Sequence, residues 1–158
     1  MSNIKCVVSS ISTLLSSEVA TAQFVSLIEA QWGEVDHRRK TGGLDLDFDR
    51  YLGLEEAGVH FMVFAFEGDK LVGYNSMLYS ESPHTKEMTA LTDSMYILKE
   101  YRKGGLGSDM IKLAESEAKS RGCKHIMVTF KNSHPHPSIV EELGFFSYET
   151  IYAKQIGD

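Results

Sequence analysis

The sequence contains few of the residues that build disulfide-stabilised, metal-binding or membrane-spanning proteins. Its 158 residues include only two cysteines and three prolines. Cys6 and Cys123 match no metal-ligand spacing, and two cysteines do not make a disulfide framework, so we expect a reduced, cytoplasmic setting and no metal. No apolar run approaches the roughly 20 residues of a membrane-spanning helix, and residues 1–6 do not resemble a signal peptide. We therefore expect no membrane association.

Positive charge is not in excess either. Lys and Arg number 16 against 22 Asp and Glu, which gives a formal net charge of −6. This balance argues against a nucleic-acid partner and favours a cationic one. The hydrophobic content of 42% and the charged content of 24% are those of an ordinary globular domain. The length suits one domain, which we expect to span residues 1–158 without internal repeats.

The spacing of apolar residues changes from helical to strand-like near residue 58. The helical part predicts a helix after Thr13, with a buried face formed by Leu15, Val19, Ala22, Val25, Ile28 and Trp32. Further helices are predicted over residues 44–57, 108–121 and 138–143, and strands over 4–9, 59–67, 70–79, 88–98 and 124–130, with a final strand or hairpin over 146–156. Consecutive antiparallel strands followed by a strand–turn–helix–strand unit predict an α/β (α+β) fold. Its central sheet is mixed, mostly antiparallel, and flanked by helices.

A glycine-rich, cationic turn separates the predicted strand 88–98 from the helix that follows it. Residues 101–107 read Y-R-K-G-G-L-G. Backbone N–H groups at a helix start are unpaired and lie at the positive end of the helix dipole, and glycines let an anion approach them closely. The turn therefore predicts a phosphate-binding site. It is not a Walker loop, because Lys103 precedes the glycines, nor a dinucleotide-binding fingerprint, because Met110 replaces the third glycine.

A third signature, R-x-x-G-x-G, is matched and extends into the rest of the chain. Residues 97–107 read I-L-K-E-Y-R-K-G-G-L-G, Asn132 follows the next predicted strand, and L-G-F occupies residues 143–145. In this order, over roughly residues 55–155, these motifs resemble the GNAT superfamily of acetyl-coenzyme A-dependent N-acetyltransferases. Lys99 stands where proline is common in that family.

The resemblance implies a single GNAT domain that uses acetyl-coenzyme A as co-substrate. It assigns coenzyme A contacts to the end of the strand, to the turn and to the downstream asparagine, that is, to Ile97, Leu98, Arg102, Lys103, Gly104, Gly105, Leu106, Gly107, Ser108 and Asn132. The turn would hold the pyrophosphate, and the strand end the pantetheine arm. The acceptor would be an amine on a small molecule or a protein. Relatives often form homodimers, although no residue of this sequence indicates one.

Acetyl transfer to an amine needs a neutral nitrogen, and therefore a general base. An alkyl ammonium of pKa near 10.4 is neutral to only about one part in 2,500 at pH 7, a cost of about 4.6 kcal/mol. Asp93, on the strand before the turn, is the predicted base, although a purely structural carboxylate fits the sequence equally well. Strand alternation predicts that Asp93 shares one face with Met95 and Ile97.

The proton donor that many relatives use for the leaving thiolate is missing. A tyrosine is usual at the position of Val140. Tyr148 is the predicted substitute, with His134, His136 and Ser138 as alternatives. A thiol of pKa about 8.5 costs only about 2 kcal/mol as an anion at pH 7, so this donor is less important than the base. The missing tyrosine also supports a second hypothesis, a catalytically weak GNAT-fold protein that acts as a coenzyme A-binding regulatory or interaction module.

The acceptor is expected to enter beside the N-terminal helices. The resemblance implies that this region varies among relatives with acceptor type, and here it contains Trp32, Glu34, Asp36, His37 and Tyr51.

Overall fold

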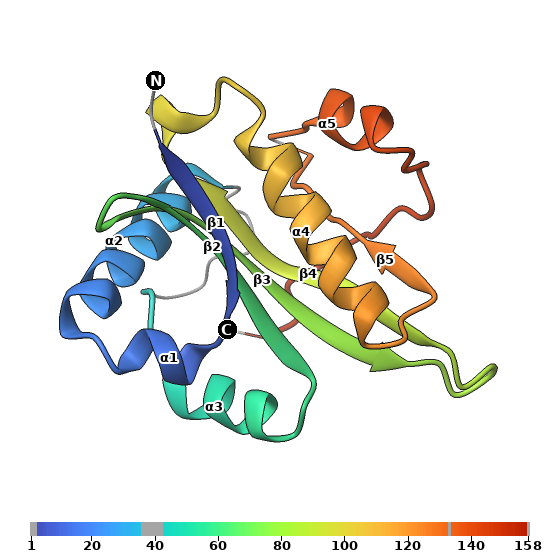
Figure 1. The fold of residues 1–158 in the computed structure, drawn as a ribbon. Helices are drawn as coiled ribbons and strands as arrows, with labels where there is room; N and C mark the ends of the chain where they lie inside the picture. Colours follow the sequence, from blue (N-terminus) through green and yellow to red (C-terminus); the bar gives the residue numbers. More distant parts are fainter. Residues whose placement is uncertain (1–2, 36–42, 133, 158) are drawn as a thin grey trace.

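The computed structural model describes residues 3–35, 43–132 and 134–157, which form one five-stranded sheet and its flanking helices (Figure 1). The strands are β1 (Ile4–Ser9), β2 (His60–Glu67), β3 (Lys70–Glu81), β4 (Met88–Ile97) and β5 (His125–Met127), in that spatial order. Neighbours from β1 to β4 are antiparallel, and β5 runs parallel to β4. The helices are α1 (Ile11–Leu15), α2 (Glu18–Glu34), α3 (Phe48–Glu56), α4 (Leu106–Ser120) and α5 (Pro137–Glu142). The predicted mixed, mostly antiparallel α+β fold is confirmed.

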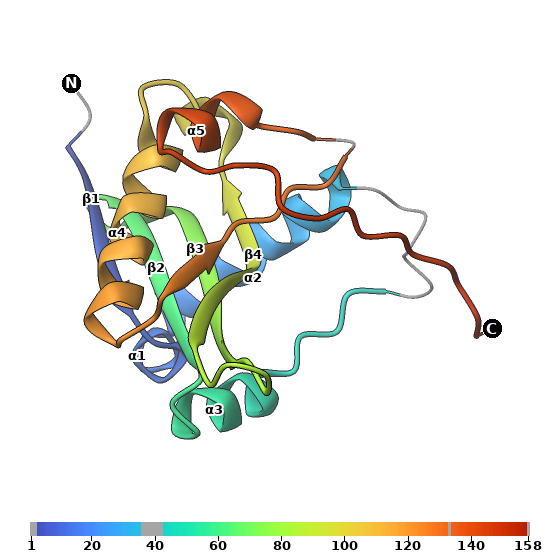
Figure 2. The same cartoon turned by 90° about the vertical axis from the view of Figure 1, so that its right-hand side faces the viewer.

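The sheet is sandwiched between two helical layers (Figures 1 and 2). Alternate residues of β2 face opposite sides, so Val63 packs with Met110 of α4, whereas Phe64 packs with Phe24 of α2. The helices α1, α2 and α3 cover the second side, and α5 contacts α4. The strands separate these two cores, so each side of β4 has its own environment.

The first predicted helix is wrong in its continuity, and of the six residues of its predicted buried face, Ile28 alone is buried. Two capping serines divide it: the Ser10 hydroxyl accepts from the Thr13 N–H to begin α1, and the Ser17 hydroxyl accepts from the Ala20 N–H to begin α2. The buried residues of α2 are Phe24, Leu27 and Ile28. Val19, predicted to be buried, is 66% exposed. It precedes the buried Ile28 by nine residues in the same helix, and at about 100° per residue this places the two side chains on opposite faces of α2.

The C-terminal strands also differ from prediction. β5 covers three residues, not residues 124–130, and residues 146–157 contain neither helix nor strand. In Figure 2 this C-terminal segment extends away from the sheet. Phe146 is 81% and Tyr152 92% exposed. The aromatic residues predicted a strand, but a strand needs a hydrogen-bonding neighbour, and the short β5 offers almost none.

One extra residue interrupts the pairing of β4 with β3. Ser76 lies opposite Ser94 and Met77 lies opposite Thr92, which leaves Asp93 between them without a partner on β3. The strand β4 therefore has one more residue than β3 at this point, an irregularity called a β-bulge. A bulge bends the strand and breaks the alternation of its side chains.

The bulge places Asp93 on the side of the sheet that α3 covers. Its carboxylate accepts a hydrogen bond from Tyr51 of α3, whereas Met95 and Ile97 pack on the α4 side. The prediction that these three β4 residues share one face is therefore wrong. Simple alternation fails here because the extra residue turns Asp93 over.

Candidate active site

The glycine-rich turn joins β4 to α4 through a short 3₁₀ turn, Lys99–Tyr101. Gly104 and Gly105 have φ angles of +102° and +87°, and a Cβ at either position would meet nothing within 4 Å. Glycine is therefore required for the backbone conformation and not for space. Gly105 is the N-cap of α4 and supplies no side-chain hydrogen bond. The first N–H groups of α4 are thus left uncapped by a side chain, as an anion-binding helix start requires.

Gly107 has a different role from the two glycines before it. It is buried, and a Cβ there would lie 3.4 Å from the Cδ1 of Ile139 in α5 and 3.7 Å from the Cδ1 of Ile97 in β4. The third glycine therefore lets α5 and β4 pack closely against the first turn of α4.

Arg102 connects the turn to the end of α2 through an ion pair with Glu34. Its Nε donates to the Ile97 carbonyl at 2.8 Å, and its Nη2 lies 2.9 Å from the Glu34 carboxylate. Tyr96 also donates to Glu34, at 2.5 Å. Burial opposes the ionisation of Glu34, but the hydrogen bonds from Tyr96 and Arg102 outweigh it and lower the Glu34 pKa. Lys103 is exposed and forms no ion pair within the described residues, so its charge stays available to an anion.

Beyond the bulge, one edge of β4 has no neighbouring strand in the described part of the chain. The pairing with β5 ends at Leu91. Further along, side chains approach the strand: Gln31 Nε2 donates to the Met95 carbonyl at 3.2 Å, and Arg102 to the Ile97 carbonyl. An extended molecule with amide groups could pair with such an edge.

Two further residues that the resemblance assigns to coenzyme A binding, Leu98 and Asn132, differ in whether they already have hydrogen-bond partners. The N–H of Leu98 donates to the Val72 carbonyl at 3.0 Å, so Leu98 cannot offer it to a thioester while this bond is kept. Asn132 is exposed, beyond the end of β5, and has no hydrogen-bond partner in the described ranges.

Asp93 is the end of a polar chain that crosses the sheet from β2. The hydroxyl groups of Tyr51 and Ser76 both donate to Asp93 Oδ2, at 2.6 and 2.9 Å. Ser76 Oγ also lies 2.7 Å from His60 Nε2, and His60 and Ser76 are each 2% exposed. Burial raises the Tyr51 pKa, with the Asp93 hydrogen bond as the second cause. Burial also lowers the His60 pKa, although the charges of Asp93 and Glu55 oppose it. His60 is thus neutral at pH 7.

His60 and Ser76 are not among the site residues predicted from the sequence. The only sequence signal was polarity, since each interrupts an apolar run within a strand that packs helices on both sides.

A sequence model described as the Acetyltransferase (GNAT) family matches residues 23–145. The chain belongs to this family. A search of curated proteins found no match. Solved structures of GNAT acetyltransferases share the fold at low sequence identity. An aminoglycoside acetyltransferase from an uncultured soil metagenomic sample has a TM-score of 0.74 and 13% identity, covering 98% of this chain and 97% of that one.

Two other similar structures are named for different acceptors. The glucosamine-6-phosphate N-acetyltransferase of Arabidopsis thaliana has a TM-score of 0.72 and 15% identity, with coverage of 98% and 99%. The ribosomal-protein-alanine N-acetyltransferase of Brucella melitensis biovar Abortus 2308 has a TM-score of 0.69 and 13% identity, with the same coverage. At these identities the likeness establishes the GNAT fold and leaves the acceptor open.

Two of the residues predicted to donate a proton in this GNAT domain, Tyr148 and His136, contact other aromatic rings. Tyr148 is 73% exposed, and its ring contacts Phe146; within the described ranges no hydrogen bond or ring contact joins it to Asp93. His136 packs against Phe130, with ring centroids 5.3 Å apart. Burial lowers the His136 pKa, and the positive charge of Arg102 adds to the effect. Of the acceptor residues suggested by the sequence, Asp36 and His37 lie outside the described residues.

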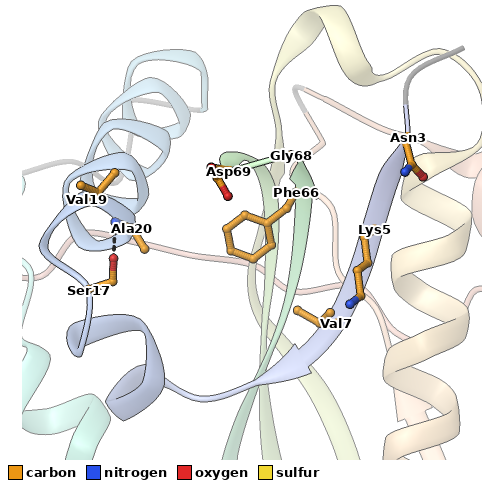
Figure 3. A pocket seen from close by; sticks show the side chains of 9 residues that line it. All are labelled: Asn3, Lys5, Val7, Ser17, Val19, Ala20, Phe66, Gly68 and Asp69. Atoms are coloured by element: carbon orange, nitrogen blue, oxygen red, sulfur yellow. Dashed lines mark hydrogen bonds between the residues drawn. The ribbon is translucent and has the colours of Figure 1, made fainter.

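A groove of this GNAT domain lies elsewhere, between β1 and the start of α2 (Figure 3). It has a volume of about 690 Å³ and is lined by Lys5, Val7, Phe66 and Asp69 among others. None of the predicted site residues lines it. Over the described ranges, no helix is long and apolar enough to cross a membrane, and no cluster of three or more His, Cys, Asp or Glu could hold a metal ion.

Proposed function

We propose that this protein transfers the acetyl group of acetyl-coenzyme A to a primary amine by direct attack on the thioester. The observation that carries the proposal is the turn between β4 and α4. Two positive-φ glycines precede an uncapped helix start, directly after a strand that, within the described residues, has no strand beside one edge beyond Leu91. A phosphate fits the helix start, and an amide-bearing arm fits the strand edge.

The residues proposed to bind acetyl-coenzyme A fall into three groups. The N–H groups of the turn and the Lys103 side chain would hold the pyrophosphate, while Arg102 keeps the turn in place through Glu34. The strand end would accompany the pantetheine arm, and Asn132 would approach it from beyond β5. The full set is Ile97, Leu98, Arg102, Lys103, Gly104, Gly105, Leu106, Gly107, Ser108 and Asn132.

Asp93 is proposed to accept the proton of the acceptor ammonium. Acetyl-coenzyme A supplies the electrophilic carbonyl, and only a neutral amine can attack it. Asp93 is exposed, yet two hydroxyl donors orient its carboxylate. The bulge puts this carboxylate on one side of β4 and the side chains of Met95 and Ile97 on the other, so amine and thioester would meet from opposite sides of the strand. Tyr148 stays a prediction as the proton donor of the leaving thiolate. Because the thiolate costs only about 2 kcal/mol at pH 7, water can also supply this proton.

The acceptor is proposed to be a cationic amine. A carboxylate with oriented donors and a net charge of −6 both attract an ammonium group. The similar structures named above suggest the test panel: an aminoglycoside such as sisomicin, glucosamine 6-phosphate and a peptide with an N-terminal alanine.

The test has a binding arm and a transfer arm. Acetyl-coenzyme A should bind in isothermal titration calorimetry, and thiol release should rise with at least one amine of the panel. Asp93→Asn should keep binding but lose about 100-fold or more in kcat. Asp69→Asn, an exposed aspartate in the β2–β3 turn, is the matched control and should behave as wild type. Binding without transfer to any amine would favour a coenzyme A-binding module, and absence of binding would refute the proposal.

A further inference from the structure

We propose that His60 and Ser76 are positioning residues that form a one-way chain of hydrogen-bond donors, holding the Asp93 carboxylate ready for the acceptor amine. This inference rests on the proposed function, because it assumes that Asp93 is the base. It adds two buried residues of β2 and β3 to the site. Neither residue needs to touch the amine or the thioester.

The direction of the chain follows from the number of protons available. A serine hydroxyl carries one hydrogen, and Ser76 gives it to Asp93 Oδ2. The 2.7 Å contact between Ser76 Oγ and His60 Nε2 must then be donated by the histidine. His60 is therefore the Nε2–H tautomer, and its proton points towards Asp93 through Ser76.

The hydrogen-bond chain leaves one oxygen of the Asp93 carboxylate for the substrate. Asp93 Oδ2 already accepts from Ser76 and from Tyr51. Asp93 Oδ1 has no hydrogen-bond partner over the described ranges. An arriving ammonium is thus directed to Oδ1, where it gives up one proton to form a neutral carboxylic acid. Because His60 Nε2 already carries a hydrogen, the proton does not continue inward and returns to solvent from exposed Asp93.

Burial supports a role in positioning and not in stability. His60 Nδ1 is buried and has no hydrogen-bond partner in the described part of the chain. An unpaired buried polar atom costs free energy, and an apolar residue would avoid that cost. Meanwhile His60 and Ser76 lie on paired central strands, whereas Asp93 lies on a bulge. The rigid strands can therefore fix a carboxylate that its own strand leaves irregular.

The ionisable groups around the chain come from three elements. Tyr51 of α3, His60 of β2 and Tyr74 of β3 interact with Asp93, and Glu55 of α3 interacts with His60. Burial keeps the imidazole neutral and the two phenols protonated near pH 7. The donor chain should therefore keep its direction across the neutral pH range.

A spectroscopic experiment tests the direction without any substrate. Nitrogen-15 NMR of the histidine side chains, at pH 7 on the whole protein, distinguishes a protonated Nε2 from a protonated Nδ1. We expect His60 as the neutral Nε2–H tautomer, and a weaker preference for it in Ser76→Ala. An Nδ1–H tautomer or a charged imidazole in the wild type would overturn the proposal.

A kinetic experiment tests the role, using the best amine of the panel. Ser76→Ala and His60→Leu should lower kcat about tenfold, the effect of one lost hydrogen bond, with the KM for acetyl-coenzyme A unchanged. His60→Gln retains a donor at the same reach without an ionisable ring and should stay within about twofold of wild type. Ser80→Ala, on the same strand and exposed, is the matched control.

Two kinetic results would contradict the inference. Full kcat in Ser76→Ala would show that the carboxylate needs no such support. A His60→Gln variant as slow as His60→Leu would show that the ionisable ring itself is required. If no amine is acetylated at all, the proposed function fails, while the tautomer measurement still decides whether the donor chain exists.

Discussion

Replacing Gly105 by alanine should destabilise the protein through the backbone alone. Its φ of +87° lies in the left-handed region, and a Cβ there would meet nothing within 4 Å. No side-chain clash contributes, so the cost is the conformational penalty of about 1–2 kcal/mol for a residue with a Cβ. For a protein of this size, we expect the melting temperature to fall by about 2–8 °C.

Gly53→Ala is the matched control for this glycine. Gly53 lies inside α3, has no positive φ, and also has open space around its Cβ position. Alanine in a helix interior is more stable than glycine by about 0.5–1 kcal/mol, so this variant should be the more stable one. A third variant, Gly105→Asn, should lose less than Gly105→Ala, because asparagine tolerates the left-handed region better.

Urea unfolding of the three variants, followed by circular dichroism, measures these differences. Acetyl-coenzyme A affinity is then measured on the folded variants, where Gly105→Ala should bind more weakly because its turn N–H groups are displaced. A Gly105→Ala protein as stable as wild type would refute the assignment of a strained turn. A destabilised Gly105→Ala variant with unchanged affinity for acetyl-coenzyme A would show that the turn does not bind the phosphate.

Three further predictions concern other parts of the molecule. Because the Glu34 pKa is lowered in the folded state, Glu34 stabilises the protein above its unfolded-state pKa of about 4.3, and this stability is lost as the pH falls through the folded-state pKa. In Glu34→Gln, the unfolding free energy should therefore fall less steeply between pH 5 and pH 3 than in the wild type. An unchanged slope would contradict this. Asn75, 1% exposed and with both amide atoms unpaired over the described ranges, should be replaceable by leucine with a gain of about 1 kcal/mol in urea unfolding, and a loss would show that the amide has a partner. Tyr152 and Ile156 are 92% and 94% exposed, and exposed apolar side chains favour self-association. Tyr152→Lys should therefore reduce concentration-dependent self-association in analytical ultracentrifugation, and equal association would exclude the C-terminal segment as its cause.

The central fold could be predicted because its signals are local. The strands β1 to β4 are short apolar runs separated by turn residues, and α4 follows a glycine turn with regular apolar spacing. The GNAT family could be recognised from the order of Arg102, Gly105, Asn132 and the L-G-F sequence, which the family match over residues 23–145 supports. Each of these features needs only neighbours in the sequence.

The missed features depend on contacts between distant segments. The bulge at Asp93 exists only in the register of β4 against β3, so alternation within β4 could not show it. The partnership of His60 and Ser76 depends on the pairing of β2 with β3. The division between α1 and α2 depends on Ser17, whose hydroxyl caps a second helix, whereas the sequence offered Ser12 and Thr13 as caps of one helix.

The bulge in β4 also has a consequence for how this domain could diversify. Because Asp93 faces α2 and α3 while Met95 and Ile97 face α4, substitutions on one helical layer need not disturb the other. Under the proposed function, changes in α3 or in the end of α2 would alter the choice of acceptor, while the glycine turn and α4 would keep binding acetyl-coenzyme A. The one extra residue of the bulge would thus let acceptor choice and co-substrate binding evolve independently.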